Sequence, residues 1–185
     1  MRTLITLSFI ISTCCAHAQN KSIDLYEFLR SAIPDSGQSG IIVSWQKGVS
    51  GGTFVKWQKV APVRGTIGYS RAGMSKIKIG AGKPENISVF LSGDKIGYNE
   101  VQLNAGLPED YQMEKLLGNK SYKAQLIKKD DSGFPTYFYK LKIPGKKEVW
   151  CILQAEMPGT AMGDAEMSLD IIILFDYSEF KKRSS

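Results

Sequence analysis

Histidine is almost missing from this chain of 185 residues, whose one copy is His17. The stretch Met1–Ala18 has the features of a cleavable secretory signal peptide, with Arg2 ahead of an apolar run and a small-x-small ending at Ala16–Ala18. We therefore expect a mature chain without imidazole. This absence excludes Ser-His-Asp and Cys-His catalysis, and it excludes the usual catalytic zinc sites, because they depend on histidine ligands.

Cysteine is also scarce. Of three cysteines, Cys14 and Cys15 belong to the predicted leader, so only Cys151 stays in the mature chain. A single thiol cannot form an internal disulfide, and without histidine it cannot complete the common zinc, iron–sulfur or copper sites. We predict no metal and no cofactor. Cys151 lies inside the apolar run Val149–Leu153, which predicts a buried and unreactive thiol.

Long uncharged runs do not occur after the leader. The apolar run Leu4–Cys15 is itself shorter than the roughly 20 residues that a membrane-spanning helix needs, and Ile171–Phe175 is flanked by Asp170 and Asp176. We expect no transmembrane segment. The predicted organisation is a signal peptide over residues 1–18 and a single β-rich globular domain over residues 19–185, secreted or periplasmic.

The formal net charge of +6 favours anionic partners. Basic residues are spread along the chain, with short clusters at Lys128-Lys129, Lys146-Lys147 and Lys181–Arg183. Such clusters are typical of a solvated surface. No nucleic-acid-binding motif accompanies them, so we do not expect a nucleic-acid partner.

Short runs rich in β-branched and aromatic residues dominate the rest of the sequence. The runs Ile41–Trp45 and Thr53–Trp57 flank Gly48–Gly52 and predict a hairpin. Further strands are predicted between glycine-, proline- or aspartate-containing turns, at Lys76–Ile79, Ile87–Leu91, Lys95–Leu103, Tyr122–Lys128, Tyr137–Ile143, Glu148–Ala155 and Met167–Tyr177.

Helical spacing occurs in two places. Gln19–Ile33 has apolar residues at helical intervals, and Asp24 with Glu27 resembles a capping box. Pro108–Leu117 starts with proline and acids and is closed by Gly118. The predicted fold class is therefore mainly β (α+β): a single-domain antiparallel sandwich or barrel-like sheet with about two helices.

Two motifs resemble catalytic loops but fail on context. Gly48–Gly52 fits the Gly-x-Ser-x-Gly pattern of hydrolases, yet it lies between two strand-like runs and no histidine is present to act as base. Gly80–Pro84 is similar to a phosphate-binding loop, but Pro84 stands where that motif needs a hydroxyl residue. We interpret both segments as turns.

The best binding candidates are aromatic residues next to cations. The tripeptide Trp-Gln-Lys occurs twice, at residues 45–47 and 57–59. Because side chains alternate between the two faces of a hairpin, Trp45, Lys47, Trp57 and Lys59 are expected on one face. An aromatic plane beside a cation stacks on sugars or anchors a protein interface. The glycine-bounded segment that holds Tyr69 and Arg71 is a candidate binding loop beside it. The competing interpretation puts the tryptophans in the core, with the lysines reaching solvent.

We therefore predict a non-catalytic binding protein that meets a protein or an anionic glycan, and inhibitor or immunity-type roles fit this description. The first alternative is a carboxylate-based hydrolase, since two carboxylates suffice for glycoside hydrolysis. Its candidate residues are in the acidic loop between two strong strands, at Glu156, Asp164 and Glu166. The second alternative is a membrane-active protein led by its first helix.

Overall fold

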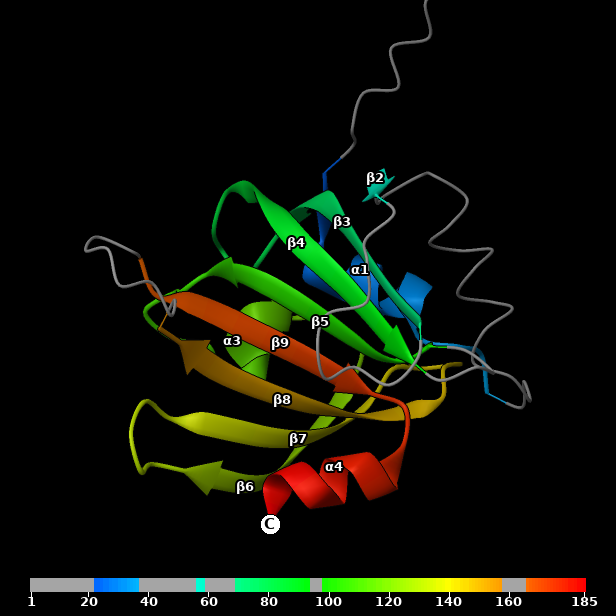
Figure 1. Ribbon diagram of the computed structural model, residues 1–185, viewed down its shortest axis with the longest axis vertical. Coiled ribbons are helices and arrows are strands. Elements are labelled where there is room, and N and C mark those ends of the chain that lie inside the picture. Colours follow the sequence, from blue (N-terminus) through cyan, green and yellow to red (C-terminus); the bar gives the residue numbers. More distant parts are fainter. Residues whose placement is uncertain (1–21, 37–55, 59–68, 94–97, 158–165) are drawn as a thin grey trace, which may run out of the picture.

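One sheet of nine strands organises the part of the chain that the computed structural model describes, which comprises residues 22–36, 56–58, 69–93, 98–157 and 166–185. Eight strands follow the order β1-β3-β4-β5-β9-β8-β7-β6, and β2 pairs with β3 beside this path (Figure 1). Neighbouring strands are antiparallel except β1 and β3, which are parallel. The predicted β-rich α+β fold is confirmed.

The strands and helices have the following bounds. The strands are β1 Ile23–Asp24, β2 Lys56–Gln58, β3 Tyr69–Lys78, β4 Pro84–Gly93, β5 Tyr98–Gly106, β6 Lys123–Asp130, β7 Thr136–Lys142, β8 Glu148–Glu156 and β9 Ser168–Leu174. The described helices are α1 Leu25–Ala32, α3 Met113–Leu117 and α4 Tyr177–Ser184. Every strand predicted after residue 70 is present, and β3 begins earlier than the predicted residue 76.

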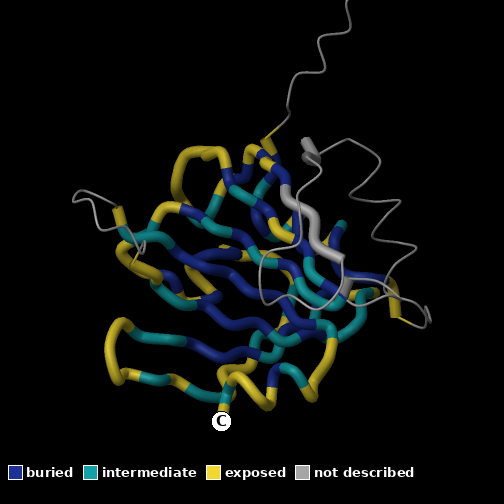
Figure 2. Tube along the Cα trace, viewed as in Figure 1, coloured by how far each residue is buried: buried dark blue, intermediate teal, exposed yellow. Residues whose placement is uncertain are grey.

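One face of the sheet, here the core face, packs against α1 and α3. Alternate residues of the strands point to this side, as Ile87, Val89 and Leu91 do on β4, and all are buried. Helix α1 covers them with a stripe at helical spacing, formed by Leu25, Phe28, Leu29 and Ala32. Figure 1 shows both helices behind the sheet, and Figure 2 shows burial concentrated along the middle strands.

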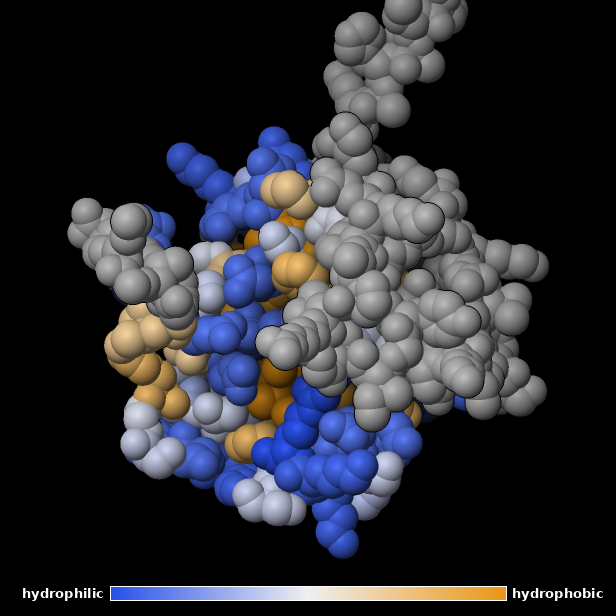
Figure 3. All heavy atoms as spheres, in the orientation of Figure 1, coloured by the Kyte–Doolittle hydropathy of each residue, from blue (hydrophilic) through white to orange (hydrophobic). Residues whose placement is uncertain are grey.

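The opposite face, here the outer face, carries α4. Phe180 of α4 is 2 % exposed and forms a second apolar cluster with strand residues, namely Phe138, Ile152, Ile172 and Leu174. Its ring lies 6.1 Å from that of Phe138 and 6.4 Å from that of Trp150. Strand β9 is therefore buried on both faces. Figure 3 shows hydrophilic residues over the lower part of this face, where α4 lies.

The helix predictions need three corrections. Predicted helix 19–33 begins only at Leu25, because Asp24 accepts a hydrogen bond from the Glu27 amide (2.8 Å) as its N-cap, and residues 23–24 pair with β3. Within predicted helix 108–117 only α3 is helical, and it ends at Gly118, as expected, with φ 65°. Helix α4 was not predicted: the last predicted element was a strand over residues 167–177, and no element was predicted after it.

The predicted hairpin is described only in part. Residues 41–45 and 48–52 lie outside the described residues, as do residues 1–21 with the predicted leader. The second predicted strand is represented by β2, which pairs antiparallel with β3. The Gly80–Pro84 segment is a turn, as predicted, and Gly80 has the positive φ of 55° that favours glycine.

Candidate functional site

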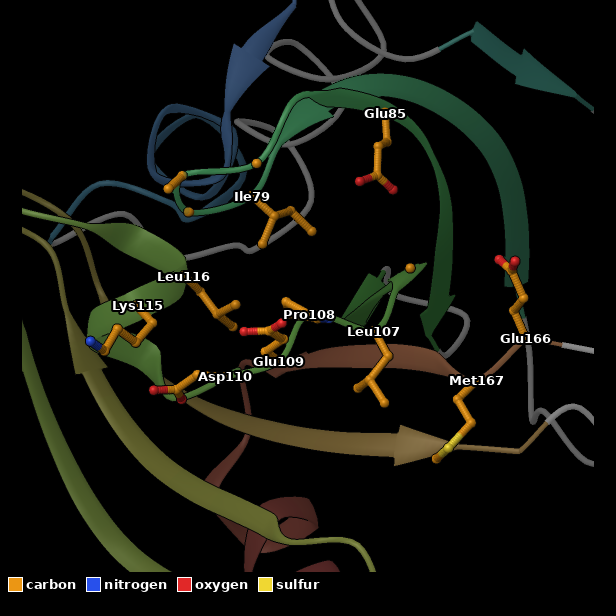
Figure 4. Close-up of a pocket in the computed structure, with 14 residues that line it drawn as sticks. Ile79, Glu85, Leu107, Pro108, Glu109, Asp110, Lys115, Leu116, Glu166 and Met167 are labelled. Carbon is orange, nitrogen blue, oxygen red and sulfur yellow. The ribbon is translucent and has the colours of Figure 1, made fainter.

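A groove of about 970 Å³ opens at one end of the sheet. Four parts of the chain enclose it: the β3–β4 turn, the segment after β5, α3 and the residues just before β9 (Figure 4). Its apolar lining comes from Ile79, Leu107, Pro108, Leu116 and Met167. Its charged lining comprises one lysine, Lys115, and four carboxylates that we call the groove acids: Glu85, Glu109, Asp110 and Glu166.

Close backbone approach fixes one wall of the groove. The Gly80 amide donates to the Leu116 carbonyl oxygen (3.0 Å), which ties the β3–β4 turn to α3. A Cβ at Gly80 would lie 2.6 Å from the Lys115 carbonyl oxygen, so only glycine fits there. At the end of β5, a Cβ on Gly106 would lie 3.2 Å from a Glu85 carboxylate oxygen. At Gly106, the missing side chain lets the Glu85 carboxylate approach the backbone.

Within the described part of the chain, the groove acids have no ion-pair partner, and neither does Lys115. The Asp110 carboxylate accepts one hydrogen bond, from the Gln112 amide at 3.1 Å. All four groove acids are exposed to solvent, and like charges around one hollow add to a negative potential there. The groove is thus locally acidic on a chain whose net charge is +6.

A second polar feature lies near the same end of the sheet, on the outer face. Asp170 of β9 is 1 % exposed, and its two carboxylate oxygens accept hydrogen bonds from Gln102 Nε2 (2.8 Å) and Asn104 Nδ2 (2.9 Å) on β5. The same Asn104 nitrogen also contacts Ser168 Oγ at 3.0 Å. A buried carboxylate needs such donors, because burial without them is costly.

Glu156, at the end of β8, contacts this buried carboxylate. Its pKa is raised by a hydrogen bond to Asp170, then by the charge of Asp170, and then by burial. The contact with Asp170 thus favours the protonated form of the Glu156 carboxyl over the ionised form. Ser168 of β9 pairs with Gly106 of β5 on one side and with Glu156 of β8 on the other. Glu156 is therefore level with the groove-lining residue Gly106 across the sheet, and Asp170 lies two residues further along β9.

The structure describes little of the binding residues that were predicted from aromatic side chains next to cations. Trp45, Lys47 and Lys59 are outside the described residues, and for Trp57, Tyr69 and Arg71 only the backbone is described. Trp57 pairs with Gly73, two residues from Arg71 along β3, and Tyr69 pairs with Gly93. Whether these side chains bind a partner stays a prediction.

The acidic-loop candidates separate in space. Glu156 contacts Asp170, Glu166 lines the groove, and Asp164 lies outside the described residues. Sequence reasoning missed Glu85, Glu109 and Asp110 as groove residues. The available signal was the run Pro108-Glu109-Asp110, which was interpreted as a helix start because proline and acids are typical of a first helical turn.

Cys151 is fully buried, as predicted, and burial raises the pKa of its thiol.

Among the described residues no group of three or more histidine, cysteine or acidic side chains is arranged to hold a metal ion. No helix in this part of the chain has the length and apolarity needed to span a bilayer.

Comparison of the chain with protein-family models, curated proteins and solved structures found no match.

Proposed function

We propose that this chain is an exported, non-catalytic binding protein whose groove receives a cationic segment of a partner protein. The observation that carries the proposal is the set of four groove acids without ion pairs among the described residues, in a groove that also has an apolar lining. Export rests on the predicted leader, and a non-catalytic role is favoured because the lack of histidine after residue 17 removes the common histidine-dependent chemistries.

The chemistry of the groove selects the ligand. Arginine and lysine combine an apolar stem with a cationic end, so the stem packs on the partly exposed Leu107 and Met167 while the cation meets carboxylates. The net positive charge of the whole chain favours a negatively charged partner instead. An anionic glycan is therefore the rival ligand. The local charge of the concave surface, rather than the total charge, decides which ligand enters it.

The test titrates the protein, purified after export, with two blocked seven-residue peptides that are identical except for one arginine or one glutamate. We expect binding of the arginine peptide, and roughly tenfold weaker binding to the double variant Glu109→Gln/Asp110→Asn, because charge-assisted hydrogen bonds contribute about 1.5–3 kcal/mol. The matched control Glu27→Gln/Glu114→Gln removes the same charge from exposed helix positions outside the groove.

Three outcomes of this titration have assigned meanings. Binding of the arginine peptide that depends on Glu109 and Asp110 supports the proposal. Equal affinity for both peptides, or equal weakening in the control variant, contradicts a groove-specific cation site. Preference for the glutamate peptide supports the anionic-ligand rival instead.

A carboxylate-based hydrolase is the second candidate, and one observation favours it. The raised pKa of Glu156 suits a general acid. However, Asp170 is 1 % exposed and both of its oxygens accept amide hydrogens, so it cannot reach a substrate as the second carboxylate. If purified protein hydrolyses glycans and Glu156→Gln abolishes the turnover, the hydrolase replaces the binding protein.

The membrane-active alternative is the least supported. Leu25 and Phe28, which would have to enter a bilayer, are at most 1 % exposed because α1 packs on the core face. An amphipathic helix binds lipid only through an accessible apolar face. Leakage of anionic vesicles that depends on Phe28 would contradict this assignment.

A further inference from the structure

A second recess adjoins the groove. It has a volume of about 380 Å³ and shares residues 107–110 with the groove, so this four-residue ridge separates the two hollows. Its other wall is aromatic and proline-rich and consists of Tyr111, Phe134, Pro135 and Tyr137. We call it the aromatic recess.

The aromatic recess is rigidly built. The Tyr111 hydroxyl donates a hydrogen bond to the Pro135 carbonyl oxygen, which ties the ridge to the β6–β7 turn. The rings of Tyr111 and Tyr137 meet edge to face, with centroids 5.5 Å apart at 80°. Burial raises the pKa of Tyr111, so its hydroxyl stays protonated as a donor. A ligand entering here orders few side chains, which lowers the entropic cost of binding.

Phe134 is the exposed part of this wall. Its side chain is 50 % exposed, although it neighbours buried aromatic residues. A large apolar side chain left half in water beside a preformed recess gains most from burial by a ligand. Aromatic anchors give large contact area at low conformational cost and commonly fill such recesses.

The two hollows differ in the number of carboxylates and in aromatic lining. Glu109 and Asp110 line both hollows, whereas Glu85 and Glu166 line only the groove, so the groove has the larger negative charge. Beside the aromatic recess, Lys129 Nζ lies 5.7 Å from the centroid of the Tyr137 ring and is paired with Asp131 at 2.8 Å. Only the recess has an aromatic wall. A cationic side chain therefore belongs in the groove, and an uncharged ring belongs in the aromatic recess.

We propose that one extended segment of the partner crosses the ridge and places a cationic side chain in the groove and an aromatic side chain in the aromatic recess. This inference rests on the proposed function, since it names the second residue that the same partner segment must carry. The recognised element is thus a pair of side chains, one cationic and one aromatic, a few residues apart on an extended chain.

The experiment uses blocked seven-residue glycine–serine peptides that carry one arginine and one tryptophan, separated by one, two or three residues. Matched peptides have alanine for tryptophan or glutamine for arginine. Affinities for the exported protein are measured by calorimetry. We expect one spacing to bind best and its alanine peptide to bind about tenfold more weakly, as expected for a buried aromatic anchor.

A double-mutant cycle locates the aromatic side chain. Phe134→Ala should weaken the best tryptophan peptide about tenfold and leave the alanine peptide unchanged. Leu126→Ala is the control, because Leu126 is similarly exposed (48 %) on β6 but does not line either hollow. Unchanged unfolding temperatures of both variants verify that the fold is intact.

The two proposals fail in different ways. If arginine binding depends on Glu109 and Asp110 but Phe134→Ala weakens tryptophan and alanine peptides equally, or tryptophan adds no affinity, the aromatic recess is not an anchor site and the cationic groove stands. If tryptophan binds through Phe134 without any need for arginine, the cationic groove is wrong and the coupled element with it. If no peptide of the series binds, both proposals are contradicted.

Discussion

The two ends of the described sheet use charge in opposite ways. At the α4 end, Arg183 bonds Glu100 of β5 at 2.7 Å and Glu179 at 3.3 Å, Lys182 also contacts Glu179 at 3.3 Å, and Lys128 Nζ donates to the Ser184 carbonyl at 2.8 Å. At the groove end, no groove acid has an ion-pair partner among the described residues.

This difference separates charges that hold the fold from charges that are available to a ligand. Paired charges around a docked helix add to stability, although each exposed pair adds little. Unpaired like charges in a recess slightly oppose folding through mutual repulsion, and their field attracts an opposite charge. Side chains at the α4 end should therefore matter for stability, and the groove acids should matter for binding.

The largest expected effect is at the α4 end. Phe180→Ala removes the buried ring that joins α4 to the outer face, and we expect a loss of about 3 kcal/mol in the free energy of unfolding. Tyr177→Ala is the comparison, because Tyr177 is 54 % exposed on the same helix. Chemical denaturation measures both variants, and equal losses would mean that Phe180 does not anchor the helix.

A smaller loss is expected near the groove end from the buried carboxylate. Asp170→Ala leaves the amides of Gln102 and Asn104 without their acceptor, and we expect about 2 kcal/mol of destabilisation. Gln154 pairs with Asp170 across β8 and β9 but is only partly buried, so Gln154→Ala is the control. An Asp170→Ala variant as stable as this control would contradict the structural role of the carboxylate.

The ion pair between α4 and β5 should contribute less. Glu100 is largely shielded, with a side-chain exposure of 13 %, so Glu100→Gln should cost about 1 kcal/mol by separating it from Arg183. Glu148→Gln breaks a more exposed bridge to Lys140 and should cost only a few tenths of a kcal/mol. Thermal unfolding in low salt tests this order, and reversal of the order would contradict it.

The smallest stability effect concerns the pH dependence caused by Glu156. Because the pKa of Glu156 is raised in the folded state, the native protein binds more protons than the unfolded chain between the ordinary glutamate pKa and the raised value. Stability from this group is therefore present at lower pH and is lost as the pH rises through that window. Glu156→Gln should flatten this decline, and an unchanged pH profile would show that the pair does not share a proton.

The sequence predicted those parts of the fold that local pattern determines. Short runs rich in β-branched, aromatic and other apolar residues predicted β7 and β8 to within one residue, and they predicted the central part of β4, because each of these strands buries side chains in the core. Helix α4 lacked such a signal, since Phe180 is its only fully buried residue and its partners come from distant strands. The predicted start of α3 was wrong because Tyr111 is buried against the β6–β7 turn, which keeps residues 108–112 out of a helix.

The groove could not be predicted in the same way. Glu85, Asp110 and Glu166 are far apart in the sequence, and they line one hollow only because of the β3–β4 and β5–β9 pairings. Single-sequence patterns indicate strands but not their order, so they do not reveal which turns meet. The lack of histidine was visible from the start, and it indicated which chemistries to exclude rather than where a ligand binds.

Unfolding of the exported protein and of its Glu109→Gln/Asp110→Asn variant, each with and without the best arginine–tryptophan peptide, tests the central claim most directly. Without peptide, the variant should be as stable as the unmodified protein or slightly more stable, since Asp110→Asn keeps the oxygen that accepts from Gln112 and the loss of two like charges relieves repulsion. With peptide at about 100 times its dissociation constant, the unmodified protein should gain about 2.7 kcal/mol and the variant much less. A variant that is less stable alone, yet gains as much from the peptide, would mean that the groove acids serve the fold and not the ligand.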